Sequence, residues 1–285
     1  MILLSPAKVN LFLAILHKRG DGYHELASLF QTIDLCDTLH ISLSAKDHLS
    51  SSDPALPADH RNLVMKAILL FREKTGLQDP ISAHIEKKIP QEAGLGGGSS
   101  NAATTLWALN QLFGEPASLQ SLRQWGAELG SDVPFFFSGG TAYCTGRGEI
   151  IRDVTPLENG KLTIIKPKFG LSTPVVYSHL DLATLPSRDT ESALRSFYEG
   201  KPLYFNDLEH SAFKVAPELL RIKKKLLEHG FTHVLLCGSG SSLFCLGQGD
   251  IDRVKRSEDV LCYEAKFIKN SPHWYIPKVV QKLGF

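Results

Sequence analysis

The sequence lacks a large charge of either sign, a long apolar run and any paired-cysteine motif, and each absence excludes a class of protein. Its 31 Lys and Arg residues against 30 Asp and Glu residues leave a net charge of +1, so no overall field would recruit nucleic acid or an anionic membrane. No apolar run is long enough to span a bilayer. The first eight residues carry no basic region ahead of their apolar part, so we expect no secretory signal.

The five cysteines are odd in number and widely spaced, and none belongs to a Cys-x-x-Cys or Cys/His ligand pattern. All lie in apolar surroundings, which favours buried reduced thiols and a cytoplasmic location. No acidic cluster stands out as a metal site, so we assign no protein metal ligands. The chain has 285 residues, of which 43% are hydrophobic and 21% charged. It is therefore expected to fold as one large domain or two ordinary ones.

The most informative stretch that is present runs from Pro90 to Ala103. Four glycines in the five positions 94–98 leave the backbone without β-carbons, so its N–H groups can close on an anion. Ser99, Ser100 and Asn101 are residue types favoured at a helix N-cap, and apolar residues then recur at helical spacing up to position 113. A flexible linker would rarely precede such a helix at once. The stretch predicts a phosphate-binding loop at a helix N-terminus.

Two familiar phosphate loops do not fit this stretch. A Walker A loop requires a lysine after its glycines, and none follows here. A dinucleotide fingerprint that starts at Gly94 requires glycine or alanine where Ser99 stands. A second glycine-rich segment, Gly238–Ser242, lies between two predicted strands at His233–Cys237 and Leu243–Leu246. It is either a plain hairpin turn or a second, weaker phosphate cradle.

Three sets of polar residues have both an ordinary and a functional interpretation. Lys8 and Asn10 point the same way from an apolar strand predicted at residues 2–16, so they either protect a sheet edge or line a site. Tyr23 and His24 share a turn-rich loop, where they could pack normally or bind a flat base. Asp132 precedes the apolar run 133–137, where an N-cap or turn aspartate before a proline is slightly favoured over a general base or charge anchor.

The hydrophobic patterns predict the remaining elements. In the first half they are two strand-like runs between Leu26 and Ser44 around residues 35–38, a loop at 45–60, a helix from Asn62 to Thr75 that stops at Gly76, a strand at Ile81–Ile89 and a helix at Leu119–Leu129. In the second half they are strands at Leu162–Lys166 and Val260–Ile268, with helices near 190–199, 206–213 and 217–229. Lys223–Lys225 is predicted to be the solvated face of the last helix, whose apolar stripe is Leu219, Leu220, Ile222, Leu226 and Leu227.

Three segments taken together resemble the three motifs of the GHMP kinase superfamily. They are Pro-Ala-Lys-Val-Asn-Leu from Pro6, Gly-Leu-Gly-Gly-Gly-Ser-Ser from Gly94, and Gly-Ser-Gly-Ser-Ser from Gly238. Within the superfamily, residues 6–13, 21–26 and 95–103 resemble the branch that phosphorylates a cytidine-diphosphate-linked methylerythritol. The resemblance runs along nearly the whole chain and is looser in the C-terminal half. Gln91 and Glu92 depart from it, because small or apolar residues are more usual there.

The resemblance implies an α+β fold of two domains, with the active site in the cleft between them. We place the first domain at residues 1–155 and the second at residues 156–285. It implies transfer of the γ-phosphoryl group of ATP to the 2-hydroxyl of that acceptor, in non-mevalonate isoprenoid synthesis. ATP and Mg²⁺ are the expected cofactors, and the metal would be held by phosphates, a loop hydroxyl and water. We expect a cytoplasmic monomer or weak dimer that acts on a small molecule and binds neither nucleic acid nor membrane.

The resemblance also implies roles for individual residues. Lys8 and Asp132 are the expected catalytic pair, which suits a reaction that needs a proton acceptor and charge stabilisation. Asn10, Tyr23, His24, Thr173 and Tyr177 are expected to bind the acceptor, with cytosine between the two tyrosines and His24 on its edge. The expected ATP-binding residues are Asn62 and Lys87 on the adenine side, followed by Pro90, Gln91, Glu92, Ala93, Gly94, Leu95, Gly96, Gly97, Gly98, Ser99 and Ser100.

Three rival functions remain open from the sequence. Another GHMP enzyme, such as a mevalonate-type kinase, would share Lys8, the glycine loop and Asp132 but would not need a cytosine site. A non-catalytic nucleotide sensor would keep the loop without turnover, although the presence of both Lys8 and Asp132 argues against it. A single-stranded RNA binder could use Tyr23, His24 and the lysines at 223–225, but the near-neutral charge disfavours this function.

Overall fold

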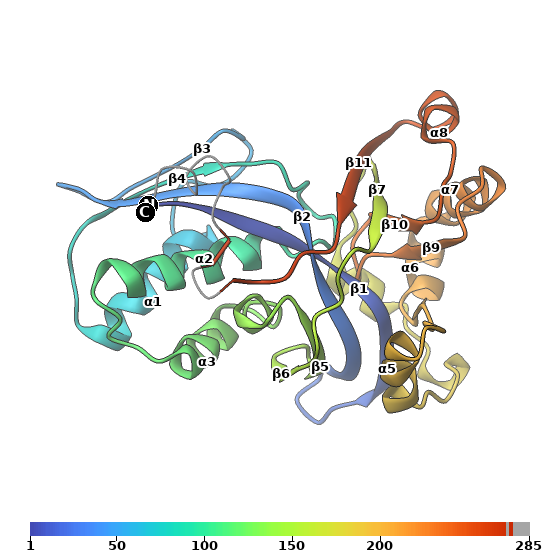
Figure 1. The fold of residues 1–285 in the computed structure, drawn as a ribbon, viewed down its shortest axis with the longest axis horizontal. Helices are drawn as coiled ribbons and strands as arrows, with labels where there is room; N and C mark the ends of the chain where they lie inside the picture. Colours follow the sequence, from blue (N-terminus) through green and yellow to red (C-terminus); the bar gives the residue numbers. More distant parts are fainter. Residues whose placement is uncertain (272–273, 276–285) are drawn as a thin grey trace.

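Two β-sheets, flanked by helices, organise the chain (Figure 1). The computed structural model describes residues 1–271 and 274–275. Within these residues one sheet has seven strands and the other has four, which confirms the α+β prediction. The end of the second predicted domain, residues 272–273 and 276–285, lies outside the described residues.

The larger sheet is built on a long hairpin of β1 (Ile2–Lys18) and β2 (His24–Leu43). The two strands pair from Ile2 opposite His40 to Lys18 opposite His24. On its other edge β2 pairs with two different strands, β4 along its C-terminal half and β5 along its N-terminal half. The remaining strands of this sheet are β3 (His48–Ser51), β4 (Ile81–Glu86), β5 (Thr141–Gly146), β6 (Ile150–Asp153) and β8 (Phe205–Asn206).

The prediction of two separate strand runs between Leu26 and Ser44 is wrong, because β2 is continuous. The pairing shifts register between Pro6 and Ala7, which face Cys36 and Ile33. Proline has no N–H to donate to the ladder, and a bulge absorbs the interruption without ending the strand. The predicted loop at 45–60 also contains the short strand β3, which pairs in parallel with β4.

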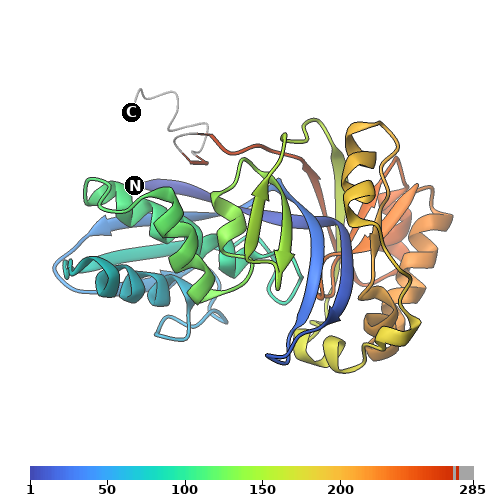
Figure 2. The same ribbon diagram turned by 90° about the horizontal axis from the view of Figure 1, so that it is seen from below.

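Helices α1 (Leu63–Thr75), α2 (Gly97–Leu112) and α3 (Leu119–Leu129) cover one face of the larger sheet. In Figure 2, seen from below, they lie in front of its strands. The predicted limits of α1 are confirmed, because the Asn62 side chain accepts a hydrogen bond from the Val64 amide and Gly76 ends the helix at φ +76°. The predicted cap of α2 is wrong, because the helix already begins at Gly97 and its N-cap is Gly96 at φ +70°.

The smaller sheet has the order β11-β7-β10-β9, with bounds β7 (Lys161–Pro167), β9 (His233–Leu236), β10 (Leu243–Leu246) and β11 (Val260–Lys266). One of its faces packs on the β1 side chains Ala7, Val9 and Leu11. Because side chains alternate along a strand, Lys8 and Asn10 point to the opposite side of β1. β8, which follows residue 156, pairs with β1 at Phe12 and Leu13, so both halves of the chain contribute to the larger sheet.

The other face of the smaller sheet is covered by C-terminal helices. The helical elements of this half are α4 (Thr173–Ser178), η2 (Leu182–Thr184), α5 (Thr190–Tyr198), α6 (Glu209–Val215), α7 (Pro217–Glu228) and α8 (Ile251–Ser257). A further short helix, η1 (Pro134–Phe137), lies in the first half between α3 and β5. On α7 only Leu219, Ile222 and Leu226 are buried, so the predicted stripe that included Leu220 and Leu227 is too wide. No strand was predicted for β5 or β6, and no helix for α4 or α8.

The cysteine prediction is confirmed in its main part. All five thiols are free, and four of them are buried while Cys262 is partly buried. Burial raises the pKa of Cys36 and of Cys237 to about 12, so both stay protonated at neutral pH. None of the helices in the described residues has the length and apolar character needed to cross a bilayer.

Candidate active site

A cavity of about 610 Å³ brings together both predicted catalytic residues, all five predicted acceptor-binding residues and two of the thirteen predicted ATP-binding residues. Its walls come from β1, from the turn between β1 and β2, from the loop before α2, from the turn before η1 and from α4, so both halves of the chain line it. The predicted residues that line it are Lys8, Asn10, Tyr23, His24, Gly94, Gly96, Asp132, Thr173 and Tyr177.

Lys8 lines this cavity, and the residue is almost completely buried. Its Nζ donates a hydrogen bond to Asn10 Oδ1 at 2.8 Å and lies 3.4 Å from Asp132 Oδ2. Asn10 in turn donates to Ser28 Oγ at 2.9 Å. The Asp132 side chain is 31% exposed. Lys8 is therefore not an edge lysine, and the carboxylate that faces its ammonium remains open to a ligand.

Asp132 occupies a turn that is anchored by a buried aromatic cluster. Pro134 starts η1, whose three phenylalanines are all buried. Asp132 does not cap this short helix, because the N-cap residue is Val133 and no side chain bonds to the cap. The packing of η1 therefore fixes the backbone of Asp132, while its carboxylate is left to pair with Lys8.

The first glycine loop, Gly94–Gly98, leads directly into α2. Gly96 has no side chain to accept hydrogen bonds from the first amides of α2, and no acidic residue lies in the first turn. These amides and the positive end of the helix dipole are thus available to an anion. A Cβ on Gly96 would lie 3.0 Å from Lys8 Cγ, so the loop passes close against Lys8. Ser100 Oγ, at the start of the same helix, is buried without a hydrogen-bond partner among the described residues.

A fully buried carboxylate that the sequence analysis missed, Asp37, holds this loop in place. Asp37 Oδ1 accepts hydrogen bonds from the Lys88 and Ile89 amides at 2.8 Å each, and Oδ2 accepts one from Asn101 Nδ2 at 3.0 Å. Lys87 Nζ pairs with it at 3.0 Å. Asp37 therefore joins the chain before the loop to the helix after it. An aspartate inside an apolar strand was the available sequence signal.

The second glycine loop, Gly238–Ser242, packs against the first. The Ser241 and Ser242 amides donate to the Glu92 and Ala93 carbonyls at 3.3 and 3.2 Å. A Cβ on Gly94 would lie 1.8 Å from the Cys237 oxygen, and a Cβ on Gly240 would lie 2.0 Å from the Gly94 nitrogen. The second loop is therefore more than a plain hairpin turn, because two of its amides are bonded to the segment just before the first loop. Gly238 and Ser239 line the cavity, and their contact with phosphate stays a prediction.

Aromatic rings gather at the other end of the cavity. The Tyr23 side chain is 56% exposed, whereas His24 stacks on Tyr177 with ring centroids 5.3 Å apart and planes 29° apart. Burial, assisted by the nearby Lys18, lowers the pKa of His24 below its ordinary value. Burial also raises the pKa of the Tyr177 hydroxyl. Thr173 Oγ1 lies 2.7 Å from Ser239 Oγ, which ties α4 to the second loop.

Several predicted ATP-binding residues do not line this cavity. The Asn62 side chain caps α1 and donates to the Pro57 carbonyl at 2.7 Å, and the Lys87 ammonium is held by Asp37. Gln91 donates to Asp53 at 2.8 Å, and Glu92 Oε2 lies where a Cβ on Gly170 would be. Also outside the lining are Pro90, Ala93, Leu95, Gly97, Gly98, Ser99 and Ser100; their contact with ATP stays a prediction.

Comparison with known proteins identifies the fold and the family. Residues 62–140 match the GHMP kinase N-terminal domain and residues 184–257 match the GHMP kinase C-terminal domain. A solved structure of a 4-(cytidine 5'-diphospho)-2C-methyl-D-erythritol kinase superposes with a TM-score of 0.79 at 33% identity, over 94% of this chain and 99% of the other. A mevalonate kinase structure, at 18% identity and a TM-score of 0.67, covers 95% of this chain and 100% of its own; it shows the fold alone.

Relatives from distant organisms match along almost the whole chain. The 4-diphosphocytidyl-2-C-methyl-D-erythritol kinase of Protochlamydia amoebophila is 54% identical over 97% of this chain and 94% of the relative. The chloroplastic/chromoplastic enzyme of the same name from Solanum lycopersicum is 43% identical over 98% of this chain and 74% of its own length. On these similarities, the chain belongs to the 4-diphosphocytidyl-2-C-methyl-D-erythritol kinase family of the GHMP kinases.

Proposed function

We propose that this chain transfers the γ-phosphoryl group of ATP to the 2-hydroxyl of 4-diphosphocytidyl-2-C-methyl-D-erythritol, a step of non-mevalonate isoprenoid synthesis. The observation that carries this function is the Lys8–Asp132 pair, 3.4 Å apart. It lies in one cavity with the first glycine loop and a set of aromatic side chains. The loop suits the phosphates of the donor, the Lys8–Asp132 pair suits the reacting hydroxyl, and the aromatic side chains suit the cytosine ring.

Asp132 is the proposed proton acceptor for the reacting hydroxyl. Its partly exposed carboxylate can accept a hydrogen bond from the hydroxyl, orient the oxygen toward the γ-phosphorus and take its proton as the bond to phosphorus forms. The Lys8 ammonium, buried beside it, offsets the negative charge that develops on the transferred group. Asn10 fixes the ammonium through a 2.8 Å hydrogen bond, so little reorganisation is needed at the moment of reaction.

The first glycine loop is the proposed phosphate-binding surface, through the unpaired amides that open α2. Within the described residues no group of three or more His, Cys, Asp and Glu side chains could hold a metal. A Mg²⁺ ion fits this site only as a companion of ATP, bound by phosphate oxygens, water and an oxygen donor such as the buried Ser100 hydroxyl. The ion would neutralise charge on the phosphates.

The aromatic end of the cavity is the proposed cytosine site. Tyr23 offers an exposed ring, and base–aromatic stacking contributes roughly 1–3 kcal/mol per base. His24 occupies a face of Tyr177, so a base between the two tyrosines requires the imidazole to turn its edge toward the cytosine. The lowered pKa of His24 keeps the imidazole neutral near pH 7, with one N–H donor and one acceptor for that edge.

The decisive experiment measures ADP release from MgATP with the cytidylated acceptor, beside mevalonate and homoserine. We expect turnover only with the cytidylated acceptor, and a loss of about 10²–10⁴-fold in kcat for Asp132→Asn because the proton acceptor is removed. Turnover with mevalonate or homoserine instead would discard the cytosine site, and ATP binding without any turnover would favour a sensor. An unchanged kcat in Asp132→Asn would refute the role of Asp132.

Three further expectations complete the proposal. The two domains would meet near residue 155, in the connection between β6 and β7. The near-zero net charge supports a protein that binds no nucleic acid. The free thiols support a cytoplasmic location. Sedimentation analysis should give a monomer or a weak dimer, and a salt-dependent RNA complex would contradict the assignment of partners.

A further inference from the structure

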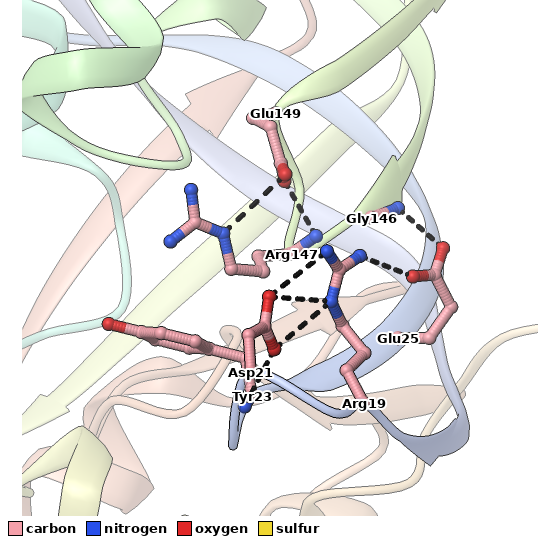
Figure 3. A network of polar contacts seen from close by, with 7 residues as sticks. All are labelled: Arg19, Asp21, Tyr23, Glu25, Gly146, Arg147 and Glu149. Atoms are coloured by element: carbon pink, nitrogen blue, oxygen red, sulfur yellow. Dashed lines mark hydrogen bonds and ion pairs between the residues drawn. The ribbon is translucent and has the colours of Figure 1, made fainter.

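The turn that carries Tyr23 is held by a network of charged side chains (Figure 3). Arg19 pairs with Asp21 at 3.1 Å and with Glu25 at 2.7 Å. Asp21 accepts a hydrogen bond from the Tyr23 amide at 3.1 Å, and Glu25 accepts one from the Gly146 amide at 2.9 Å. The network therefore joins the β1–β2 turn to the β5–β6 turn, although the two are far apart in the sequence.

Arg147, in the β5–β6 turn, reaches from this network into the cavity. Its guanidinium carbon lies 4.8 Å from the centroid of the Tyr23 ring, and its side chain is one of those that line the cavity. The next residue, Gly148, borders Asp132, since a Cβ on it would lie 3.6 Å from Asp132 Oδ1. Arg147 thus lines the cavity beside Tyr23 of the proposed cytosine site, and its chain neighbour borders the proposed proton acceptor.

Most of the hydrogen-bonding capacity of this guanidinium is unused. Glu149 accepts from its Nε, at the long distance of 3.5 Å, and within the described residues no acceptor is bonded to its two Nη atoms. The side chain is 33% exposed. The N–H groups of a guanidinium lie in its own plane and point outward from its edge. They can therefore still bind an anion when one face of the guanidinium stacks on a tyrosine.

An acceptor that places its base on Tyr23 and its hydroxyl on Asp132 must run its diphosphate linker through the space between them. We propose that Arg147 is a substrate-binding residue that recognises this diphosphate through its Nη atoms, while Tyr23 supports the plane of the guanidinium. This inference rests on the proposed function, and it assigns the selection of a nucleoside diphosphate over a bare nucleoside to a residue that the sequence analysis did not single out. Charge-assisted, planar contacts to phosphate are the chemistry for which arginine is suited.

The test compares the binding of cytidine and cytidine diphosphate by calorimetry. The wild-type protein should bind cytidine diphosphate more tightly than cytidine. In Arg147→Met, which keeps an unbranched side chain without the charge, we expect this preference to fall by roughly tenfold or more. Arg147→Lys keeps the charge but loses the planar fork, so it should recover part of the preference. In turnover assays the KM of the cytidylated acceptor should rise, with a much smaller change in kcat and in the KM of ATP.

Arg152→Met is the matched control. Arg152 lies 4.4 Å from the Tyr143 ring, belongs to the same hairpin and does not line the cavity. Its replacement removes a comparable cation–π contact and should leave both affinities unchanged. Thermal unfolding of each variant shows that it is folded.

The possible results separate this inference from the proposed function. Equal losses for cytidine and cytidine diphosphate in Arg147→Met would overturn the inference, because Arg147 would then act only by holding Tyr23. An unchanged preference would also overturn it, and if the wild-type protein still phosphorylated the cytidylated acceptor the proposed function would stand. A wild-type protein that neither binds cytidine diphosphate nor phosphorylates the acceptor would remove both.

Discussion

The two glycine-rich loops have similar compositions and opposite uses. In the first, Gly96 leaves the opening amides of α2 without a side-chain cap among the residues that the structure describes. In the second, the Ser241 and Ser242 amides are bonded to the Glu92 and Ala93 carbonyls, which directly precede the first loop. Glycine is required in both, but in the second it permits the close approach of another backbone, as the 2.0 Å clash of a Cβ on Gly240 shows. Glycine content alone therefore does not distinguish an anion site from a backbone contact.

The contact between the two glycine-rich loops also helps to hold the candidate site together. The second loop belongs to the hairpin of β9 and β10 in the smaller sheet, and the first belongs to the connection between β4 and α2. Their contact fixes the two halves of the chain at the point where both border Lys8. The first loop can leave its amides unpaired because Asp37 and the second loop hold the backbone around it.

The largest effect is expected from breaking the contact between the loops. Gly240→Ala places a methyl group on the backbone of Gly94, which cannot move without displacing the first loop. We expect the free energy of unfolding to fall by about 3 kcal/mol or more, measured by urea denaturation. Gly20→Ala is the control, because nothing lies within 4 Å of its Cβ. Equal stability of the two variants would contradict a tight contact between the loops.

A smaller loss is expected from Asp37→Asn, which weakens the support of the first loop alone. The variant leaves the Lys87 ammonium buried without a counter-charge, and we expect unfolding to become easier by about 2 kcal/mol. Because the support of the first loop through Lys87 and Asn101 would be weakened, the KM of ATP should rise more than the KM of the acceptor. Equal changes in the two constants would indicate a purely structural role for Asp37.

A matched pair of serines sharpens the comparison without disturbing either backbone. Ser100 Oγ and Ser242 Oγ are both buried and have no hydrogen-bond partner among the described residues. Replacing either by alanine should therefore change the free energy of unfolding by less than about 1 kcal/mol. Ser100→Ala should raise the KM of MgATP, whereas Ser242→Ala should leave it unchanged. The same increase in both variants would mean that the two loops serve ATP alike.

The smallest effect is a pH dependence restricted to the aromatic end of the cavity. The pKa of His24 lies below its ordinary value of 6.5 because of burial and Lys18, so the imidazole is neutral at pH 7 and gains a proton only in more acidic solution. The KM of the acceptor should be constant above about pH 7 and rise as pH falls below 6.5, while the KM of ATP stays constant. His24→Asn should abolish the acidic rise, and its persistence would exclude His24 as the cause.

Local patterns predicted what local interactions determine. Asn62 caps the start of α1 and Gly76 caps its end, as expected, because capping interactions act within a few residues of the helix terminus. The start of α2 was placed too late, because the turn depends on the left-handed backbone of Gly96 and not on the side chains that follow it. The sequence also indicated that Lys8 and Asn10 share one side of a strand, and their hydrogen bond confirms this.

Contacts between distant segments were not predictable from one sequence. Asp37 becomes a support of the first glycine loop only because β2 passes beside the segment 87–89 and the start of α2. The proposed role of Arg147 depends on its contact with Tyr23, which belongs to another hairpin. In both cases the residue type was visible, but nothing local indicated its partner, because pairing between strands of the sheet brings them together.

Under the proposed function, the length of the β1–β2 hairpin also determines how far the base-binding end of the acceptor site lies from the catalytic pair. Lys8 lies in the middle of β1, and the turn with Tyr23 and His24 lies at its end, so the number of residues between them sets the distance from the reacting centre to the base site. Each residue of a strand adds about 3.3 Å, and side chains alternate between faces. A change of one residue per strand would turn the side chains at the tip to the other face relative to Lys8, whereas a step of two residues per strand, or about 6.6 Å, would keep them on the same face. Such steps would adapt the same catalytic pair to shorter or longer acceptors.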